Sequence, residues 1–180
     1  MIYAFLANGF EETEAIVPID LIRRCEKDLI TVGVGGQIIK GSHGIPVFVD
    51  IEEREIVLDE NLEMIILPGG MPGTINLEKS EFVQKAVDYC VENNIPIASI
   101  CAAPSILGHK GILDGKKACC YTGYDTQLGN AIYDADAKVC VDGNFITARG
   151  AGVALEFAFA LVEKLISKER CEILKASLLC

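Results

Sequence analysis

The sequence is poor in the residues that most metal centres need. It has only two histidines, His43 and His109, and its eight cysteines include no C-x-x-C pair. Structural zinc sites combine such ligands at short, fixed spacings, and the adjacent Cys119 and Cys120 would face opposite sides of a strand. We therefore expect no bound metal.

Basic residues are also scarce, because 16 Lys and Arg against 26 Asp and Glu give a net charge of −10. A field of this sign repels phosphate backbones, so we expect no nucleic-acid partner. No apolar run approaches the ~20 residues of a membrane span, so we expect no membrane partner. The apolar residues 1–7 have no basic leader and run into Glu11 and Glu12. This pattern predicts a first core strand rather than a signal peptide, and hence a cytoplasmic protein.

Disulfides are not needed to hold this chain together. Its 180 residues, 51% of them hydrophobic, are enough to bury a core without covalent links. We expect a single domain over residues 1–180 whose thiols are mostly reduced and buried, where they behave as small hydrophobes. Cys25, Cys90 and Cys140 fit this description, whereas one other cysteine lies in a different setting.

Apolar, strand-like runs alternate with helical stretches along the chain. The expected strands cover residues 2–7, 29–34, 63–67, 95–100 and 117–121, and hairpins are expected at 38–49 and 138–147. The first expected helix ends near residue 24, and the others cover 82–91, 103 onward, 151–166 and 168–177. This alternation predicts an α/β protein, a flavodoxin-like three-layer α/β/α sandwich with a mostly parallel central sheet. In such folds sites lie beyond the carboxyl ends of strands, here after Ala7, Leu67, Ile100 and Tyr121.

The segment around Cys101 is the most informative. A buried strand stops at Cys101, two alanines allow a tight turn, and Pro104 suits the first turn of a helix. This pattern is typical of a nucleophile elbow with Cys in place of Ser. Free backbone N–H groups and the helix dipole favour a thiolate, so we expect Cys101 alone to have a strongly lowered pKa.

A glycine-rich loop follows the strand that ends at Leu67. The run Pro68-Gly69-Gly70 lets the backbone approach a ligand closely. Its N–H groups could form an anion cradle or half an oxyanion hole. An ordinary glycine turn explains the same residues equally well, so the two interpretations stay open.

Three acids, Glu11, Glu12 and Glu14, follow the first strand. Their simplest role is to complement the dipole of the helix they open. A carboxyl buried beside Cys101 would instead have a raised pKa and could donate a hydrogen bond to the thiolate. Pro18 cannot donate to the carbonyl of Glu14, which predicts an irregularity there, but the pattern does not rank the three acids. His109, roughly 12 Å along its helix from Cys101, and His43, in a loop, are not placed to form a Cys–His pair.

Taken together, these motifs resemble the ThiJ/PfpI superfamily, and most closely its parkinsonism-associated deglycase branch with the bacterial relatives. The resemblance covers the whole chain and is carried by Gly9-Phe10-Glu11-Glu12-Thr13-Glu14, Pro18-Ile19-Asp20, Arg23-Arg24, Leu67-Pro68-Gly69-Gly70, Ile100-Cys101-Ala102-Ala103-Pro104 and Thr147-Ala148-Arg149-Gly150.

The resemblance implies a role for each matching residue. Cys101 would be an oxidation-sensitive nucleophile, with Glu14 as its protonated hydrogen-bond partner. The N–H groups of Gly70 and Ala102 would form the oxyanion or sulfinate site. Gly69, Tyr121 and Arg149 would line the site. The resemblance also implies a homodimer with the first helix at its interface, which agrees with the apolar side chains of Ile16, Val17, Ile19 and Ile22.

Two departures shape the expected activity. The protease-like branch carries His directly after the nucleophile, where this chain has Ala102, so we do not expect peptidase activity. The deglycase branch carries a histidine at the position of Tyr121, and tyrosine, with a pKa of ~10, is a poor base near neutral pH. Two alternatives, which the same thiol would serve, are preferred over a third, a binding module with an inert site. The first is a stress-protective protein with weak, cofactor-independent glyoxalase- or deglycase-like action on 2-oxoaldehydes. The second is a redox sensor or chaperone without turnover.

Overall fold

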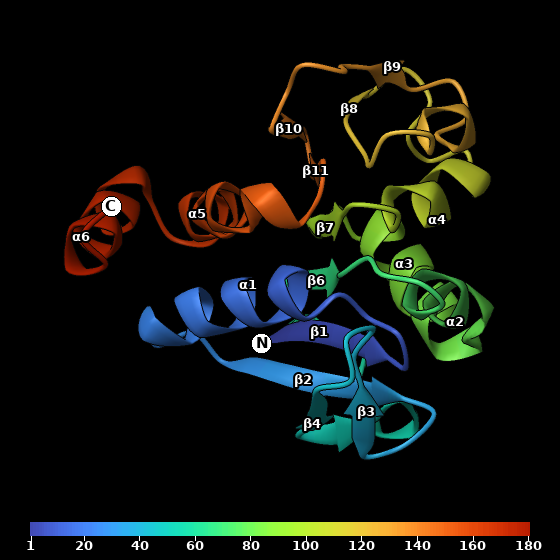
Figure 1. Ribbon diagram of the computed structural model, residues 1–180, viewed down its shortest axis with the longest axis horizontal. Helices are drawn as coiled ribbons and strands as arrows, with labels where there is room; N and C mark the ends of the chain where they lie inside the picture. Colours follow the sequence, from blue (N-terminus) through green and yellow to red (C-terminus); the bar gives the residue numbers. More distant parts are fainter.

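The computed structural model describes residues 1–180 and shows a seven-stranded sheet between two layers of helices (Figure 1). The strand order is β10-β11-β7-β6-β1-β2-β5, and every neighbouring pair is parallel except β10–β11. The predicted three-layer α/β/α sandwich with a mostly parallel sheet is therefore confirmed.

The strands of the main sheet are β1 (Ile2–Ala7), β2 (Leu29–Val34), β5 (Ile51–Glu52), β6 (Met64–Leu67), β7 (Ile97–Ile100), β10 (Val139–Asp142) and β11 (Phe145–Ala148). Two small ribbons lie outside it, formed by β3 (Ile38–Lys40) with β4 (Pro46–Phe48) and by β8 (Lys117–Ala118) with β9 (Ile132–Tyr133). The helices are α1 (Glu12–Arg24), α2 (Gly73–Lys79), α3 (Glu81–Glu92), α4 (Pro104–His109), α5 (Ala154–Leu165) and α6 (Lys168–Ser177).

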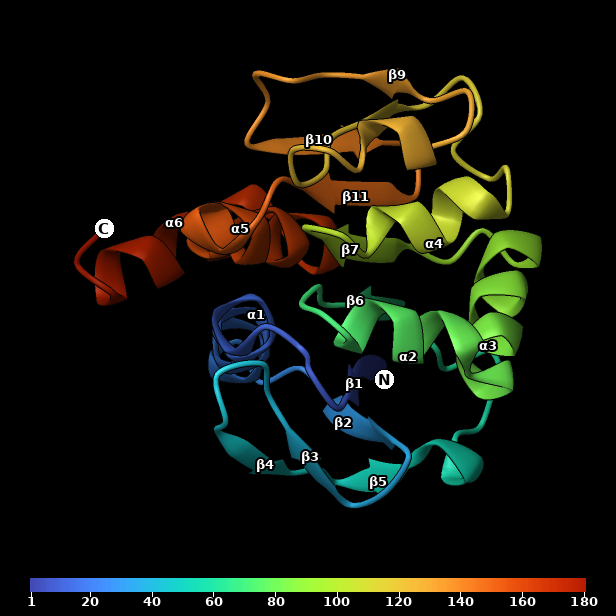
Figure 2. The ribbon, with the colours of Figure 1, turned by 45° about the vertical axis from the view of Figure 1, so that its right-hand side comes forward.

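Both faces of the sheet are covered, and β1 shows why its sequence is continuously apolar. Ile2, Ala4 and Leu6 pack into the core cluster that contains residues of α1, α5 and α6. Alternate residues such as Phe5 pack into the second cluster, with α3 and α4. Figure 2 shows α1, α5 and α6 on one side of the sheet and α2, α3 and α4 on the other. A strand buried on both faces cannot alternate apolar and polar residues.

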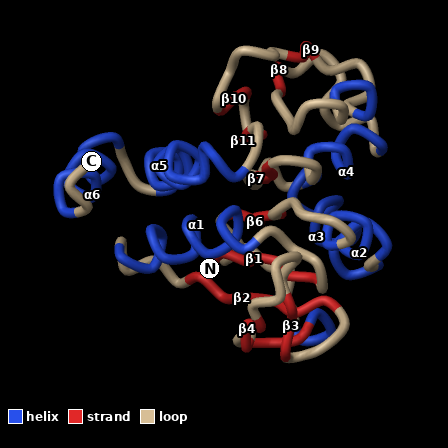
Figure 3. Tube along the Cα trace, viewed as in Figure 1, coloured by secondary structure: helices blue, strands red, loops and turns tan.

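Some expected elements differ from the structure. The predicted strand 117–121 is only two residues long and pairs with β9 instead of joining the main sheet. Helix α2 was not predicted, because its first residues belong to the glycine-rich loop. The irregularity expected near Pro18 does not interrupt the helix, because α1 runs from Glu12 to Arg24 with Pro18 inside it. The tube in Figure 3 shows how much of the chain around β8 and β9 is loop. None of the helices combines the length and apolar composition needed to cross a bilayer.

Candidate active site

Cys101 lies at a sharp turn directly after β7. Its backbone φ is +65°, a left-handed conformation that is uncommon for a residue other than glycine. The turn is held by its own N–H, which donates to the carbonyl of Ala148 at 2.9 Å, and by the N–H of Ala103, which donates to the carbonyl of Ile100 at 3.1 Å. Helix α4 begins at Pro104. The strand, turn and helix therefore form the predicted elbow, with the thiol at its tip.

The N–H groups of Gly70 and Ala102 hydrogen-bond the Cys101 sulfur. Gly70 adopts a φ of +91°, and a Cβ there would lie 2.3 Å from the backbone nitrogen of Glu11, so this position has no room for a side chain. The structure therefore supports the interpretation of the glycine loop as an anion cradle over that of an ordinary glycine turn. Two N–H donors converge on the atom that would react.

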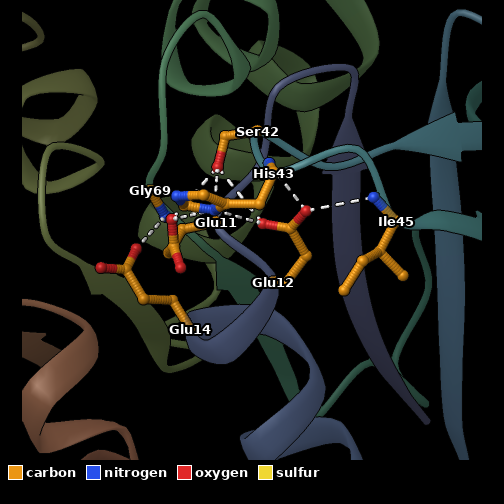
Figure 4. Close-up of polar contacts among 7 residues, drawn as sticks. All are labelled: Glu11, Glu12, Glu14, Ser42, His43, Ile45 and Gly69. Atoms are coloured by element: carbon orange, nitrogen blue, oxygen red, sulfur yellow. Dashed lines mark hydrogen bonds and ion pairs between the residues drawn. The ribbon is translucent and has the colours of Figure 1, made fainter.

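Glu14 lies on the other side of the sulfur and is 1% exposed. Its side chain hydrogen-bonds Cys101, and its carboxylate also accepts hydrogen bonds from the backbone N–H groups of Gly69, at 3.0 Å, and Ala151. Figure 4 shows the Glu14 carboxylate directed toward Gly69. The structure thus ranks Glu14 above Glu11 and Glu12 as the partner of the thiol. The hydrogen bond from Ala151 could not be predicted from the sequence, because it depends on how the segment between β11 and α5 packs beside Glu14.

Glu11 and Glu12 belong to a separate network with Ser42 and His43, drawn in Figure 4. The Glu12 carboxylate accepts hydrogen bonds from the backbone N–H of His43, at 2.9 Å, and of Ile45, at 3.4 Å, and its Oε2 lies 3.0 Å from the His43 Nδ1. Burial acts to raise the pKa of Glu12, but these hydrogen bonds outweigh it and lower the pKa to about 2. One oxygen each from Glu11 and Glu12 and a ring nitrogen of His43 lie within 4.8 Å of one another, so a cation could be held there. Their mutual hydrogen bonds already explain the cluster as a link between the β3–β4 ribbon and α1.

The ionisation of the Cys101–Glu14 pair differs from our expectation. Burial raises the pKa of Glu14 to about 7. Burial, and then the negative charge of Glu14, raise the pKa of Cys101 to about 12, although the N–H groups of Ala102 and Gly70 act in the opposite direction. The predicted strongly lowered pKa of Cys101 is therefore wrong. The helix dipole that we invoked comes from a helix of six residues that begins three residues later, so burial dominates.

The pair nevertheless holds a single proton between pH 7 and 12. That proton can sit on Glu14, leaving a thiolate that faces two N–H donors, or on the sulfur, leaving a carboxylate that faces two others. Because the pKa of Cys101 lies above that of Glu14, the arrangement with the proton on the sulfur predominates, and the thiolate forms when that proton passes to Glu14. The two groups titrate as one unit.

The pair opens into a pocket of about 390 Å³ lined by Glu11, Glu14, Gly70, Met71, Cys101, Ala102, Tyr121, Tyr124 and Ala151. Five predicted site residues thus meet there, namely Cys101, Glu14, Gly70, Ala102 and Tyr121, and Gly69 lies directly behind Glu14. Arg149 does not join them. It is exposed and lines a neighbouring hollow on the other side of Tyr121. The residues that the sequence did not predict are Met71 and Tyr124, which are set by loop conformation, and Ala151.

The two histidines lie away from the thiol, as expected. His109 is partly exposed, with its Nδ1 2.5 Å from the Glu78 carboxylate. Tyr121 occupies the position where the resemblance expects a histidine. Its side chain is 54% exposed.

An α/β sandwich in which a half-buried cysteine at a strand elbow lies beside a buried glutamate defines a class of cysteine-centred proteins. The model of the DJ-1/PfpI family matches residues 1–164, and the chain belongs to this family. This confirms the resemblance to the ThiJ/PfpI superfamily.

Individual relatives agree with this assignment. The chain is 34% identical over 169 residues to protein dj-1beta of Drosophila melanogaster, covering 93% of this chain and 90% of that protein. It is 35% identical to protein DJ-1 homolog B of Arabidopsis thaliana over 92% of this chain, but it spans only 38% of that protein's length. A deglycase of Pyrococcus abyssi is 33% identical over 81% of this chain and 87% of its own length. The crystal structure of Drosophila melanogaster DJ-1beta superposes with a TM-score of 0.93 at 33% identity, covering 99% of this chain and 96% of that chain.

Proposed function

We propose that this chain is a stress-protective domain, residues 1–180, in which Cys101 acts on small 2-oxoaldehydes such as methylglyoxal or on their early protein adducts. The observation that carries the proposal is the convergence of Gly70, Ala102 and Glu14 on one sulfur at the mouth of a pocket of about 390 Å³. A pocket of this size suits a small substrate. The similarity to a deglycase of Pyrococcus abyssi supports the substrate class.

The proposed reaction begins with the proton on Glu14 and the charge on the sulfur. The Cys101 thiolate adds to the aldehyde carbon, and the resulting hemithioacetal oxygen is held by the N–H groups of Gly70 and Ala102. Glu14 then moves a proton between carbon and oxygen as the adduct rearranges to a thioester. Water releases the hydroxy acid and restores the thiol, so that methylglyoxal plus water gives lactate without a cofactor.

The test is lactate formation from methylglyoxal by the wild type and by Cys101→Ser. We expect slow turnover by the wild type and none by Cys101→Ser. Cys90→Ser serves as the matched control, because Cys90 is buried in the opposite core cluster and should keep wild-type turnover. If Cys101→Ser forms lactate as fast as the wild type, the proposed function is wrong.

A second candidate function, a redox sensor without turnover, rests on the same cradle. Two N–H donors would stabilise the oxygens of a Cys101 sulfinate as well as those of a hemithioacetal. Limited peroxide treatment followed by peptide mapping should find sulfinate at Cys101 before any other cysteine. Sulfinate appearing first at Cys119, Cys120 or Cys180 would exclude this role for Cys101.

We also propose a homodimer formed through α1 and the β3–β4 ribbon. Of the four apolar α1 residues, Ile19 and Ile22 are buried within the subunit, while Ile16 remains 41% exposed. On the ribbon, Ile38 and Phe48 lie opposite each other and are 65% and 69% exposed. Exposed apolar side chains of this size are typical of an interface.

A further inference from the structure

A second pair of thiols lies outside the Cys101 pocket. Cys119 directly follows β8, and Cys140 lies on β10, the edge strand of the main sheet. Both are buried, and neither lines the pocket that contains Cys101. The function proposed above uses neither residue.

Thr147 brings the two cysteines together. Cys140 and Thr147 are directly opposite each other in the antiparallel β10–β11 ladder, so their side chains project from the same face of the sheet. The backbone N–H of Cys119 donates to the Thr147 hydroxyl at 3.0 Å, and the Cys119 thiol donates to the Thr147 carbonyl at 3.3 Å. The Cys119 sulfur also lies 3.9 Å from that hydroxyl. Both cysteines therefore contact one threonine on one face.

The two thiol groups also lie close enough to influence each other's ionisation. The Cys140 thiol hydrogen-bonds the Cys119 sulfur, which lowers the pKa of Cys119 and raises that of Cys140. Cys119 is thus the cysteine of this chain whose pKa is lowered, the property we expected of Cys101. A lowered pKa increases the fraction of Cys119 present as thiolate, the form that reacts on the way to a disulfide. Cys120, the adjacent residue, instead belongs to a core cluster that includes neither Cys119 nor Cys140.

We propose that Cys119 and Cys140 form an intramolecular disulfide on exposure to hydrogen peroxide. The Cys119 thiolate attacks one peroxide oxygen, the O–O bond breaks, and, with uptake of a proton, water leaves and a sulfenic acid remains on Cys119. The Cys140 thiol then attacks that sulfur, the S–S bond forms, and a second water leaves. The two thiols lose two protons and two electrons, and one peroxide becomes two waters. A cellular dithiol would return the pair to the reduced state.

The experiment compares wild-type protein with Cys101→Ser, which removes sulfinate formation at the elbow. After peroxide, each should lose the mass of two hydrogens at this pair, and trypsin should release residues 118–138 linked to residues 139–149. A reductant should separate these two peptides. Because the readout is a covalent link and not lactate, it is independent of the proposed enzymatic function.

Three variants decide which sulfurs are joined. Cys119→Ser and Cys140→Ser should each abolish the linked peptide, and either one alone is sufficient if the other fails to fold. Cys120→Ser should keep it and is the matched control. The proposal is overturned if the peptides stay separate after Cys101 is fully converted to sulfinate. It is equally overturned if the link survives in Cys119→Ser, or if it joins two chains on a non-reducing gel.

Discussion

The peptide N–H of Tyr121 donates a hydrogen bond of 2.8 Å to the carbonyl oxygen of Cys101. This backbone bond fastens the segment after β8 to the elbow whatever side chain residue 121 carries. The tyrosine ring then forms one wall of the pocket. A substitution of Tyr121 should therefore change the side chain that lines the pocket without moving the backbone that carries it.

Tyr121 is the residue that we expect to limit turnover. A positioned general base contributes about 10²–10⁴-fold when its pKa is near the working pH, and tyrosine (~10) is much further from neutrality than histidine (~6.5). Tyr121→His should raise kcat/KM for methylglyoxal, measured by lactate formation, whereas Tyr121→Phe should change it little. Rapid wild-type turnover that Tyr121→His slows would show that another group relays the proton.

The negative charge of Glu14 should hold the proton on Cys101. Replacing the carboxylate with a neutral amide keeps a hydrogen-bond donor and removes one of the two main causes that raise the pKa of the thiol. Glu14→Gln should therefore lower the thiol pKa from about 12, and Glu14→Asp, which keeps the charge but retracts it by one methylene, should keep it high. Thiolate absorbance against pH measures both. Identical titrations in wild type and both variants would mean that the two groups do not interact.

Glu14 should also make stability depend on pH. Below pH 4.5 it is protonated in both the folded and unfolded chain, and between pH 4.5 and about 7 only the unfolded chain releases the proton. The wild type should therefore lose about 3 kcal/mol relative to Glu14→Gln as the pH rises through this window, with little further change up to pH 8.

Denaturant unfolding at a series of pH values measures that difference. Glu92→Gln, a substitution of an exposed glutamate at the end of α3, is the control and should run parallel to the wild type. A constant difference between wild type and Glu14→Gln from pH 4 to 8 would contradict the raised pKa of Glu14.

Gly69 should tolerate no side chain. A Cβ there would lie 2.6 Å from the Glu14 Oε2 and 2.7 Å from the Cys101 Cβ. Overpacking of this kind typically costs about 1–3 kcal/mol, and a shift of about 1 Å in a reacting group can reduce rates about 100-fold. Gly69→Ala should therefore lower both unfolding free energy and turnover. Gly152→Ala, where an added Cβ meets nothing within 4 Å, should leave turnover unchanged, and equal activity of the two variants would refute the steric argument.

Light scattering at micromolar concentration should give twice the 19.4 kDa mass of one chain. Phe48→Asp places a charge on the most exposed aromatic of the β3–β4 ribbon and should shift the protein toward the monomer. Ile132→Asp, on the distant β9, is similarly exposed and should leave the mass unchanged. A wild-type mass of 19.4 kDa would contradict the proposed dimer.

The sequence predicts the parts of this site that depend on neighbours in the chain. The apolar run before Cys101, the alanines after it and Pro104 together indicate the elbow. Glu14 could be ranked only through the family resemblance, because its partners at Gly69 and Ala151 are brought near by the order of strands in the sheet. The thiol pKa was mispredicted for the same reason, since burial is a property of the assembled layers. The Cys119–Cys140 contact depends on the register of β10 against β11, which the sequence alone does not specify.

The strand order has a consequence for when the protein becomes reactive. β1, β6, β7 and β11 are neighbours in the sheet, yet they deliver residues 14, 69–70, 101–102 and 151 from widely separated parts of the chain. Closing these long loops is slow and requires most of the sheet to be in place. In a chain that has lost its tertiary packing, Cys101 is one of eight equivalent thiols. The Cys101–Glu14 pair therefore exists only in the completed native state, and the joint titration of its two groups would follow folding as directly as it follows function.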